Sequence, residues 1–156
     1  MRLVRPFAIA VLVLGLLGLG ARAQLVTFDV GTLTIDTKGG PRHFSVEMAL
    51  TPQQQEQGLM YRRSLAPNAG MLFVLPKIET ATFWMKNTLI PLDMLFIAAD
   101  GHVADIHERA VPLSEALIPS REPVRAVLEL NGGTVARLGI RTGDIVHHRV
   151  FGNASG

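Results

Sequence analysis

Hydrophobic and polar residues along the chain follow two distinct patterns. Residues 7–21 form one uncharged apolar run, whereas from residue 25 onward short apolar stretches alternate with turns rich in Gly, Pro, Asn and Asp. Within residues 43–50 every second side chain is apolar, which is the period of a half-buried strand. The second pattern therefore predicts a chain built mainly from short strands.

Strands are expected wherever such runs are bounded by turn residues. Residues 71–75 are apolar on both faces, which is typical of a central strand. Asp100-Gly101 predicts a tight hairpin, and residues 109–123 form the longest irregular stretch. Further strands are expected at residues 25–36 (two short runs), 82–88, 93–98, 102–107 and 124–130, and residues 140–146 form a turn that leads into a final strand.

Two short helices are expected between the strands. Thr51-Pro52-Gln53-Gln54 combines a capping residue, a proline at the first helical position and a Gln three residues after the cap. Gly58 can end that helix, and residues 134–138 predict one further turn that stops at Gly139. About eight short strands and one or two short helices predict a mainly β fold, either a small β-barrel or a sandwich.

The apolar run at residues 7–21 predicts a signal peptide covering residues 1–23. Its 15 residues fall short of the ~20 that span a bilayer as a helix. Arginines precede the run, and small residues follow at the positions that a signal peptidase reads. The residues concerned are Arg2, Arg5, Ala21, Ala23 and, as the new N-terminus, Gln24. We therefore expect a periplasmic or secreted protein, with an uncleaved membrane anchor as the alternative.

Removal of the signal peptide changes the charge balance. The remaining chain has twelve Lys and Arg against thirteen Asp and Glu, so the basic character of the full chain comes from its N-terminus. No run of positive charge remains that would indicate a nucleic-acid partner or an anionic membrane. The chain contains no cysteine, which excludes disulfides and thiol chemistry and, in an exported protein, favours a bacterial envelope.

Five motifs occur in a fixed order along the chain. They are Gly58-Leu59-Met60-Tyr61-Arg62, Gly70-Met71-Leu72-Phe73-Val74, the run from Phe83 to Asp93 around Trp84, Val127-Leu128-Glu129, and Gly139-Ile140-Arg141-Thr142-Gly143-Asp144. Together they resemble the domain-of-unknown-function 192 family of exported or membrane-associated prokaryotic proteins. The resemblance implies a compact, mostly β domain at residues 42–150, between an N-terminal strand segment (24–41) and a tail (151–156). It implies no activity.

The chain departs from that family's pattern at a few positions. An acidic–Arg pair is usual where Gln54 and Gln55 stand, and Ala98 occupies a position that is often acidic. Ile118 and Ala126 stand where aromatic residues are common. If those aromatic residues stack on a ligand, such stacking is weaker in this protein.

Charged residues inside apolar sequence mark the candidate site. A charge buried without a partner is costly, so each must be paired or face a solvated pocket. In a strand at 82–88, Trp84, Lys86 and Thr88 would point the same way. We hypothesise that these three line a concave ligand-binding patch, completed by Arg62, Asp93 and Glu129. The alternative is that Trp84 anchors the core and Lys86 forms a structural ion pair with Asp93 or Glu129.

An aromatic ring beside Lys, Arg and hydroxyl groups would suit a carbohydrate or a small carboxylate. The preferred interpretation is thus a non-enzymatic binding or accessory domain for a small polar ligand or an envelope protein. The alternative is an envelope carbohydrate hydrolase that uses Asp93 and Glu129 as a carboxylate pair. Ser120 lacks the flanking glycines of a nucleophile elbow, and the methionines and histidines lack metal-binding spacing, so we expect no catalytic residue, cofactor or metal.

Overall fold

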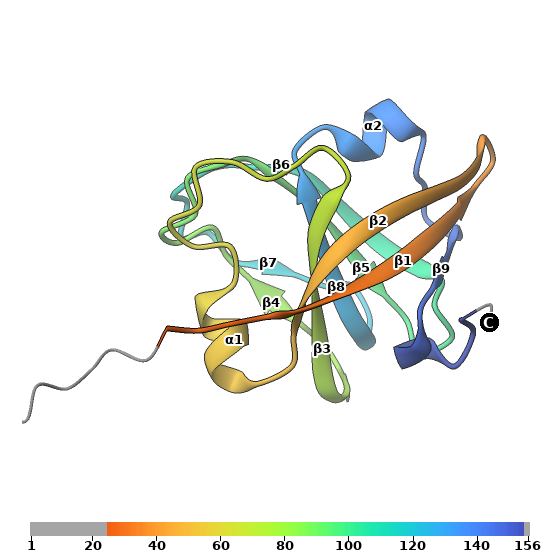
Figure 1. Cartoon of the computed structure of the whole chain (residues 1–156), viewed down its shortest axis with the longest axis horizontal. Helices are drawn as coiled ribbons and strands as arrows, with labels where there is room; N and C mark the ends of the chain where they lie inside the picture. Colours follow the sequence, from red (N-terminus) through yellow and green to blue (C-terminus); the bar gives the residue numbers. More distant parts are fainter. Residues whose placement is uncertain (1–24, 155–156) are drawn as a thin grey trace, which may run out of the picture.

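The computed structural model describes residues 25–154 and is mainly β, as predicted (Figure 1). The two α-helices are short, and a 3-10 turn lies near the C-terminus. The strands are β1 (Asp29–Thr37), β2 (Gly40–Ala49), β3 (Ala69–Glu79), β4 (Thr82–Phe83), β5 (Leu92–Ile97), β6 (Val103–Ala110), β7 (Ile118–Pro119), β8 (Val124–Asn131) and β9 (Ile145–His147). The helical elements are α1 (Pro52–Gln57), α2 (Thr134–Leu138) and η1 (Arg149–Phe151).

Seven strands form one curled sheet, a half-barrel, in the order β6-β5-β8-β3-β2-β1-β9. Neighbouring strands are antiparallel except β2 and β3, which run parallel and are connected through α1. The two edges of the sheet approach each other at one point, where His102 and Ile145 form an isolated bridge. The Val103 N–H also donates to the Asp144 carbonyl at 2.8 Å, so part of the exposed edge is satisfied.

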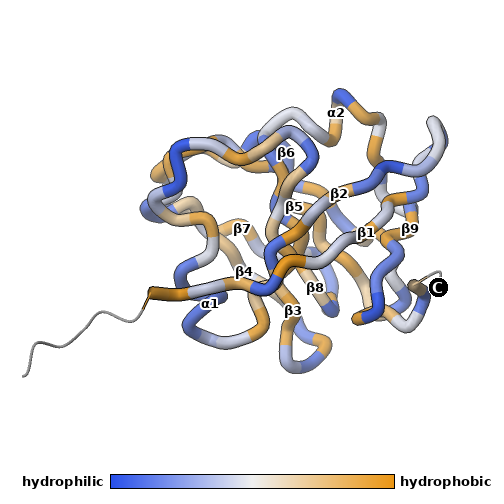
Figure 2. The backbone as a smooth tube through the Cα atoms, viewed as in Figure 1, coloured by the Kyte–Doolittle hydropathy of each residue, from blue (hydrophilic) through white to orange (hydrophobic). Residues whose placement is uncertain are grey.

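Apolar side chains pack on both faces of this sheet. Polar and apolar residues alternate along β1 and β2, as the tube in Figure 2 shows. One face forms a core with α2 and η1, and it includes Leu33, Val46, Leu95 and Leu128. The other face forms a second core beneath α1 and the small β4–β7 sheet. The central strands β5 and β8 are buried on both faces and carry no free edge.

The predicted start of α1 is confirmed. The Thr51 hydroxyl accepts from the Gln54 N–H at 3.2 Å, and the Gln54 side-chain oxygen accepts from the Thr51 N–H at 3.0 Å. This reciprocal capping box satisfies two backbone donors of the first turn. Gly58 ends the helix with a φ of 46°, a conformation that favours glycine. The amide of Gln55 then donates to the Val74 carbonyl at 2.8 Å and thereby ties α1 to β3.

The predicted strand at residues 82–88 is wrong beyond Phe83. Only Thr82–Phe83 pairs, with Ile118–Pro119 of β7. After Phe83 the chain turns, and Asn87 has a φ of 55°. Its carbonyl accepts from the Tyr61 N–H at 2.8 Å, so the backbone here bonds to other loops instead of a strand. The two-residue period therefore does not apply to Trp84, Lys86 and Thr88.

The two ends of the described chain are part of the sheet structure. β1 pairs with β2 along all nine of its residues, so residues 29–37 share the sheet of the 42–150 segment. In the tail, the Asn153 side chain donates to the Val146 carbonyl at 3.0 Å and accepts from the His148 N–H at 3.1 Å. The predicted signal peptide and its cleavage site between Ala23 and Gln24 lie outside the described residues. No helix within residues 25–154 is long and apolar enough to cross a membrane.

Candidate functional site

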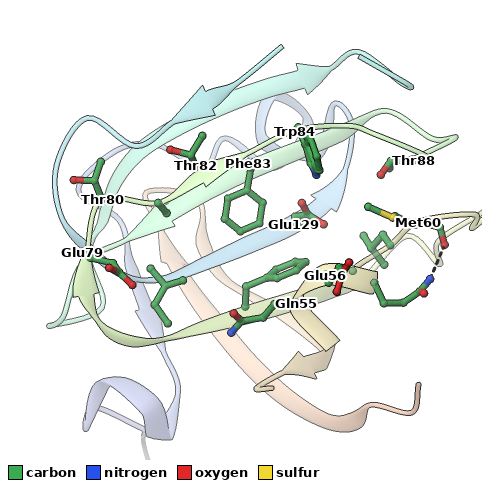
Figure 3. A pocket seen from close by; sticks show the side chains of 16 residues that line it. Gln55, Glu56, Met60, Glu79, Thr80, Thr82, Phe83, Trp84, Thr88 and Glu129 are labelled. Carbon is green, nitrogen blue, oxygen red and sulfur yellow. Dashed lines mark hydrogen bonds between the residues drawn. The ribbon is translucent and has the colours of Figure 1, made fainter. Parts of the chain in front are cut away.

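A cleft of about 290 Å³ lies on the second face of the sheet, between α1 and the segment that contains β4 (Figure 3). Residues 55–60 form one wall, and residues 79–84 with Thr88 form the other. The floor comes from Phe73 and Leu75 of β3 and from Glu129 of β8. The covering layer thus leaves this part of the sheet accessible.

Glu129 is the unusual residue of the cleft. Only 4% of the surface of Glu129 is exposed, and its carboxyl points into the space between the two walls (Figure 3). Met71 and Met94, both buried, are its partners on the neighbouring strands β3 and β5. Burial alone raises the pKa of Glu129 to about 8, since no group within residues 25–154 donates a hydrogen bond or pairs a charge with it. At neutral pH this carboxyl is therefore mostly protonated.

The register of the sheet explains why Glu129 has no ionic partner. One row of side chains crosses five strands on the cleft face, in the order Glu47, Met71, Glu129, Met94 and His107. Methionines separate Glu129 from the titratable residues on both sides. Glu47 lies two strands away, roughly 10 Å across the sheet. The nearest charged groups of the row are thus too distant for a direct contact.

Arg62 does not reach Glu129. Its guanidinium forms a two-point ion pair with Glu47, at 2.8 and 2.9 Å. The same group lies 6.0 Å from the ring centre of Phe28. Arg62 therefore neutralises the first carboxylate of the row and is absent from the cleft lining.

Trp84 stands at the mouth of the cleft with 43% of its surface exposed, so it does not anchor the core. The Lys86 ammonium lies 5.0 Å from the centre of the Trp84 ring. Its ionic partner is Glu115, at 4.0 Å, and not Asp93 or Glu129. Lys86 thus lies beside the aromatic ring at the rim, outside the cleft lining.

Thr88 is buried and lines the cleft, as hypothesised. A turn places it there, and not the two-residue period of a strand. Its hydroxyl donates to the Lys86 carbonyl at 3.2 Å. The Leu113 N–H donates to the Thr88 carbonyl at 3.0 Å. These bonds hold the turn that follows Trp84 against a neighbouring loop.

Asp93 lies on the opposite face of the sheet from Glu129. It pairs with Leu130, whereas Glu129 pairs with Met94, so the two carboxyl groups point to opposite sides. Asp93 is fully buried and accepts three backbone N–H bonds, from Arg109 at 2.8 Å, Gly133 at 3.0 Å and Val135 at 2.8 Å. It supplies the cap that Gly133, with no side chain, cannot give α2. The structure therefore does not show Asp93 and Glu129 as a pair across a cleft.

Strained backbone surrounds the mouth of the cleft. Tyr61, Asn87 and Leu113 have φ values of 64°, 55° and 63°, which cost non-glycine residues about 1 kcal/mol each. The Tyr61 N–H bonds to the Asn87 carbonyl, and the Met85 N–H bonds to the Ser114 carbonyl at 2.9 Å. Such strain persists only where surrounding contacts hold it, and it is concentrated at functional sites.

Several lining residues were not predicted. Glu56 belongs to α1, Met60 follows it, and Phe73 and Phe83 were assigned only to strands. The sequence contained one usable signal, because the Gly58-Leu59-Met60 motif directly follows the predicted helix. No sequence pattern indicated that this helix end faces Glu129.

The charge of the cleft lining is negative. Glu56, Glu79 and Glu129 line it, and the lining contains no Lys, Arg or His. Lys77 lies 3.3 Å from Glu79 and offsets one of these charges. Within the described part of the chain, no group of three or more His, Asp or Glu side chains could hold a metal ion.

Fold and cleft together define a small, curled β-sheet domain with an acidic cleft walled by aromatic residues. The chain belongs to the DUF192 family, described as "Uncharacterized ACR", whose model matches residues 33–148. The resemblance noted from the motifs is thereby confirmed.

Two solved structures are similar along most of their length. One, from Sinorhizobium meliloti 1021, is named a "putative transcription regulator"; it is 51% identical with a TM-score of 0.78, over 81% of this chain and 99% of that one. The other is a protein of unknown function from Novosphingobium aromaticivorans DSM 12444, 43% identical with a TM-score of 0.75, over 76% of this chain and 85% of that one. No curated protein matches the chain.

Proposed function

We propose that this protein is an exported, non-enzymatic domain that binds a small ligand in the cleft above Glu129. The observation that carries the proposal is the buried carboxyl on the cleft floor, which has no partner within the described chain. A ligand that bonds to this desolvated carboxyl gives it the partner that the described chain does not supply, and the open cleft gives the ligand access.

The remaining geometry favours binding over hydrolysis. The proposed carboxylate pair requires Asp93, whose oxygens are already used by three backbone N–H groups on the other face. Ser120 is also engaged, since its hydroxyl donates to the Glu122 carbonyl at 2.8 Å and accepts from the Ala81 N–H at 3.0 Å. Neither residue is available to a substrate in the cleft.

The proposed partner is a small molecule and not a nucleic acid. The name of the Sinorhizobium meliloti neighbour raises regulation of transcription as another function for that protein. On this chain, twelve Lys and Arg against thirteen Asp and Glu after residue 23 give little attraction to a phosphate backbone. A cleft lined by three glutamates favours it still less.

Trp84 supplies the test of ligand binding, since it is the single tryptophan of the chain. A library of fragments below about 200 Da is screened by amide NMR and by Trp84 fluorescence. We expect hits to shift the amides of residues 57–60 and 83–84. Trp84→Ala should weaken the binding of these fragments at least tenfold while changing the free energy of unfolding by no more than about 2 kcal/mol, because 43% of the residue is already exposed.

Two variants serve as controls for that experiment. Val30→Ala removes an exposed apolar side chain on β1, away from the cleft, and should leave fragment binding unchanged. Lys86→Met should leave the melting temperature unchanged, since an exposed ion pair at 4.0 Å is worth less than ~1 kcal/mol. The proposal fails if no fragment binds, or if every hit maps to the face of the sheet that carries Asp93.

Export is tested separately by the mass of the mature protein. Protein recovered from the periplasm or the medium should begin at Gln24, and Ala23→Phe should accumulate in the uncleaved form because the peptidase requires a small residue there. Recovery of the full-length chain from the cytoplasm would contradict export without bearing on the cleft.

A further inference from the structure

We infer that the cleft binds a small organic cation, a primary ammonium group on an apolar chain, with the ammonium directed at Glu129. The inference rests on the proposed function and names the class of its ligand. Three independent features of the cleft support it: the sign of its charge, the character of its walls and the position of its one buried carboxyl.

The charge of the lining selects against anions. An anionic ligand would meet the Glu56 carboxylate at the wall and, as the pH approaches 8, an ionised Glu129 at the floor, with no Lys, Arg or His in the lining to offset them. Opposite charges within about 4 Å attract by several kcal/mol at the effective dielectric of a protein site, and like charges repel equally. The carboxylate ligand that the sequence indicated is thus the least favourable class.

The walls select for a cation with an apolar body. Phe73 and Phe83 lie edge to face with ring centres 5.1 Å apart, and Leu59 and Leu75 complete an apolar surface. A sugar would leave hydroxyl groups unpaired against these side chains. Aromatic faces attract ammonium groups, and at the mouth the ring of Trp84 already lies 5.0 Å from the Lys86 ammonium.

The position of Glu129 gives the ammonium a single anchoring point. The carboxyl lies between the two walls, so a chain attached to an ammonium that reaches it would lie against apolar side chains of the lining such as Phe83. Such a pair satisfies a carboxyl that the protein leaves unpaired, and charged hydrogen bonds of this kind are the stronger class. Arg62 does not compete for this carboxyl, because its guanidinium is paired with Glu47.

This arrangement makes binding dependent on pH. The charged and titratable groups that face Glu129 are Glu56 from α1, Glu79 from β3, Glu47 from β2 (paired with Arg62) and His107 from β6. Because the pKa of free Glu129 is about 8, an ammonium ligand must displace a proton at lower pH. Its affinity should rise by up to tenfold per pH unit from pH 6 towards pH 8, while an alkylammonium, like Lys, stays charged throughout.

The test uses three six-carbon probes that differ in one end group: n-hexylammonium, 1-hexanol and hexanoate. Each is titrated into the protein as isolated from its host, with Trp84 fluorescence and calorimetry as readouts. We expect n-hexylammonium to bind at least tenfold more tightly than 1-hexanol at pH 8, and hexanoate not to bind. Calorimetry at pH 7 in buffers of different ionisation enthalpy should show proton release.

Matched Glu→Gln variants test whether Glu129 causes the preference for n-hexylammonium. Glu129→Gln keeps the size of the side chain and should abolish both the preference for n-hexylammonium and its pH dependence. Glu108→Gln makes the same change on the exposed part of β6, outside the cleft lining, and it should retain both. A preference that survives Glu129→Gln overturns the assignment of Glu129 as the anchor.

The remaining outcomes separate the two proposals. Binding of 1-hexanol or hexanoate in the cleft as tightly as n-hexylammonium overturns the cation inference and leaves the proposed function standing. If none of the three probes binds while other fragments bind in the cleft, the cation inference is likewise overturned and the proposed function stands. If neither the probes nor any fragment of the library binds, both the cation inference and the proposed function are overturned.

Discussion

Glu129→Gln should stabilise the protein at pH 8.5 by about 4 kcal/mol and leave its stability near pH 4.5 almost unchanged. The folded state raises the pKa of Glu129 from 4.5 to about 8, through burial. Between these values the folded protein holds a proton that the unfolded chain has lost. The free energy of unfolding therefore falls as pH rises through this window, by up to about 1.4 kcal/mol per pH unit. Because glutamine does not titrate, the variant does not lose this part of the free energy of unfolding as the pH rises.

The measurement is urea or thermal unfolding of both proteins from pH 4.5 to 9. A difference of about 4 kcal/mol corresponds to roughly 15 °C in melting temperature for a domain of this size. Glu47→Gln, in the same row but ion-paired with Arg62, should show no comparable gain at high pH. Parallel stability profiles for Glu129→Gln and the natural protein would show that the carboxyl is not desolvated.

Asp93→Ala should destabilise the protein by about 3–5 kcal/mol at neutral pH. The change leaves three backbone donors without an acceptor in a fully buried position, at the strand end of β6 and at the start of α2. Glu108→Ala, on the exposed part of β6, is the control and should change stability by less than about 0.5 kcal/mol.

Asp93→Asn distinguishes a structural role from a site in case the alanine variant does not fold. It keeps one oxygen acceptor but turns an amide donor towards backbone N–H groups, so we expect an intermediate loss of stability. Below its melting temperature it should bind cleft fragments with unchanged affinity. A folded variant of normal stability that loses binding would instead place Asp93 in the site.

Local patterns predicted the parts of the fold that neighbours in sequence determine. The two-residue period of residues 43–50 and 124–130 corresponds to β2 and β8, and the apolar run at 71–75 lies in the central strand β3. The capping box at Thr51 and the hairpin at Asp100-Gly101, where glycine has a φ of 93°, also formed as predicted. These features depend on hydrogen bonds and dihedral preferences within a few residues.

Local sequence patterns did not predict the backbone conformation of the segment after Phe83. Its β-type residues predicted a strand to Thr88, but its backbone bonds to loops that are distant in the sequence, through Asn87, Met85 and Thr88. No pattern within residues 82–88 contains that information. Three of the predicted site residues, Trp84, Thr88 and Glu129, nevertheless meet in one cleft.

The sequence by itself determined that the domain is mainly β, which runs become central strands, and that ionisable groups interrupt its apolar regions. Tertiary structure decided what each group meets. A register in which Asp93 opposes Leu130 and Glu129 opposes Met94 sends the two carboxyl groups to opposite faces. Backbone N–H donors surround the Asp93 carboxyl, whereas methionines flank the Glu129 carboxyl, which opens onto the cleft. Periodicity predicts that neighbouring residues alternate, but only the packing of distant segments decides which face is sealed and which stays open.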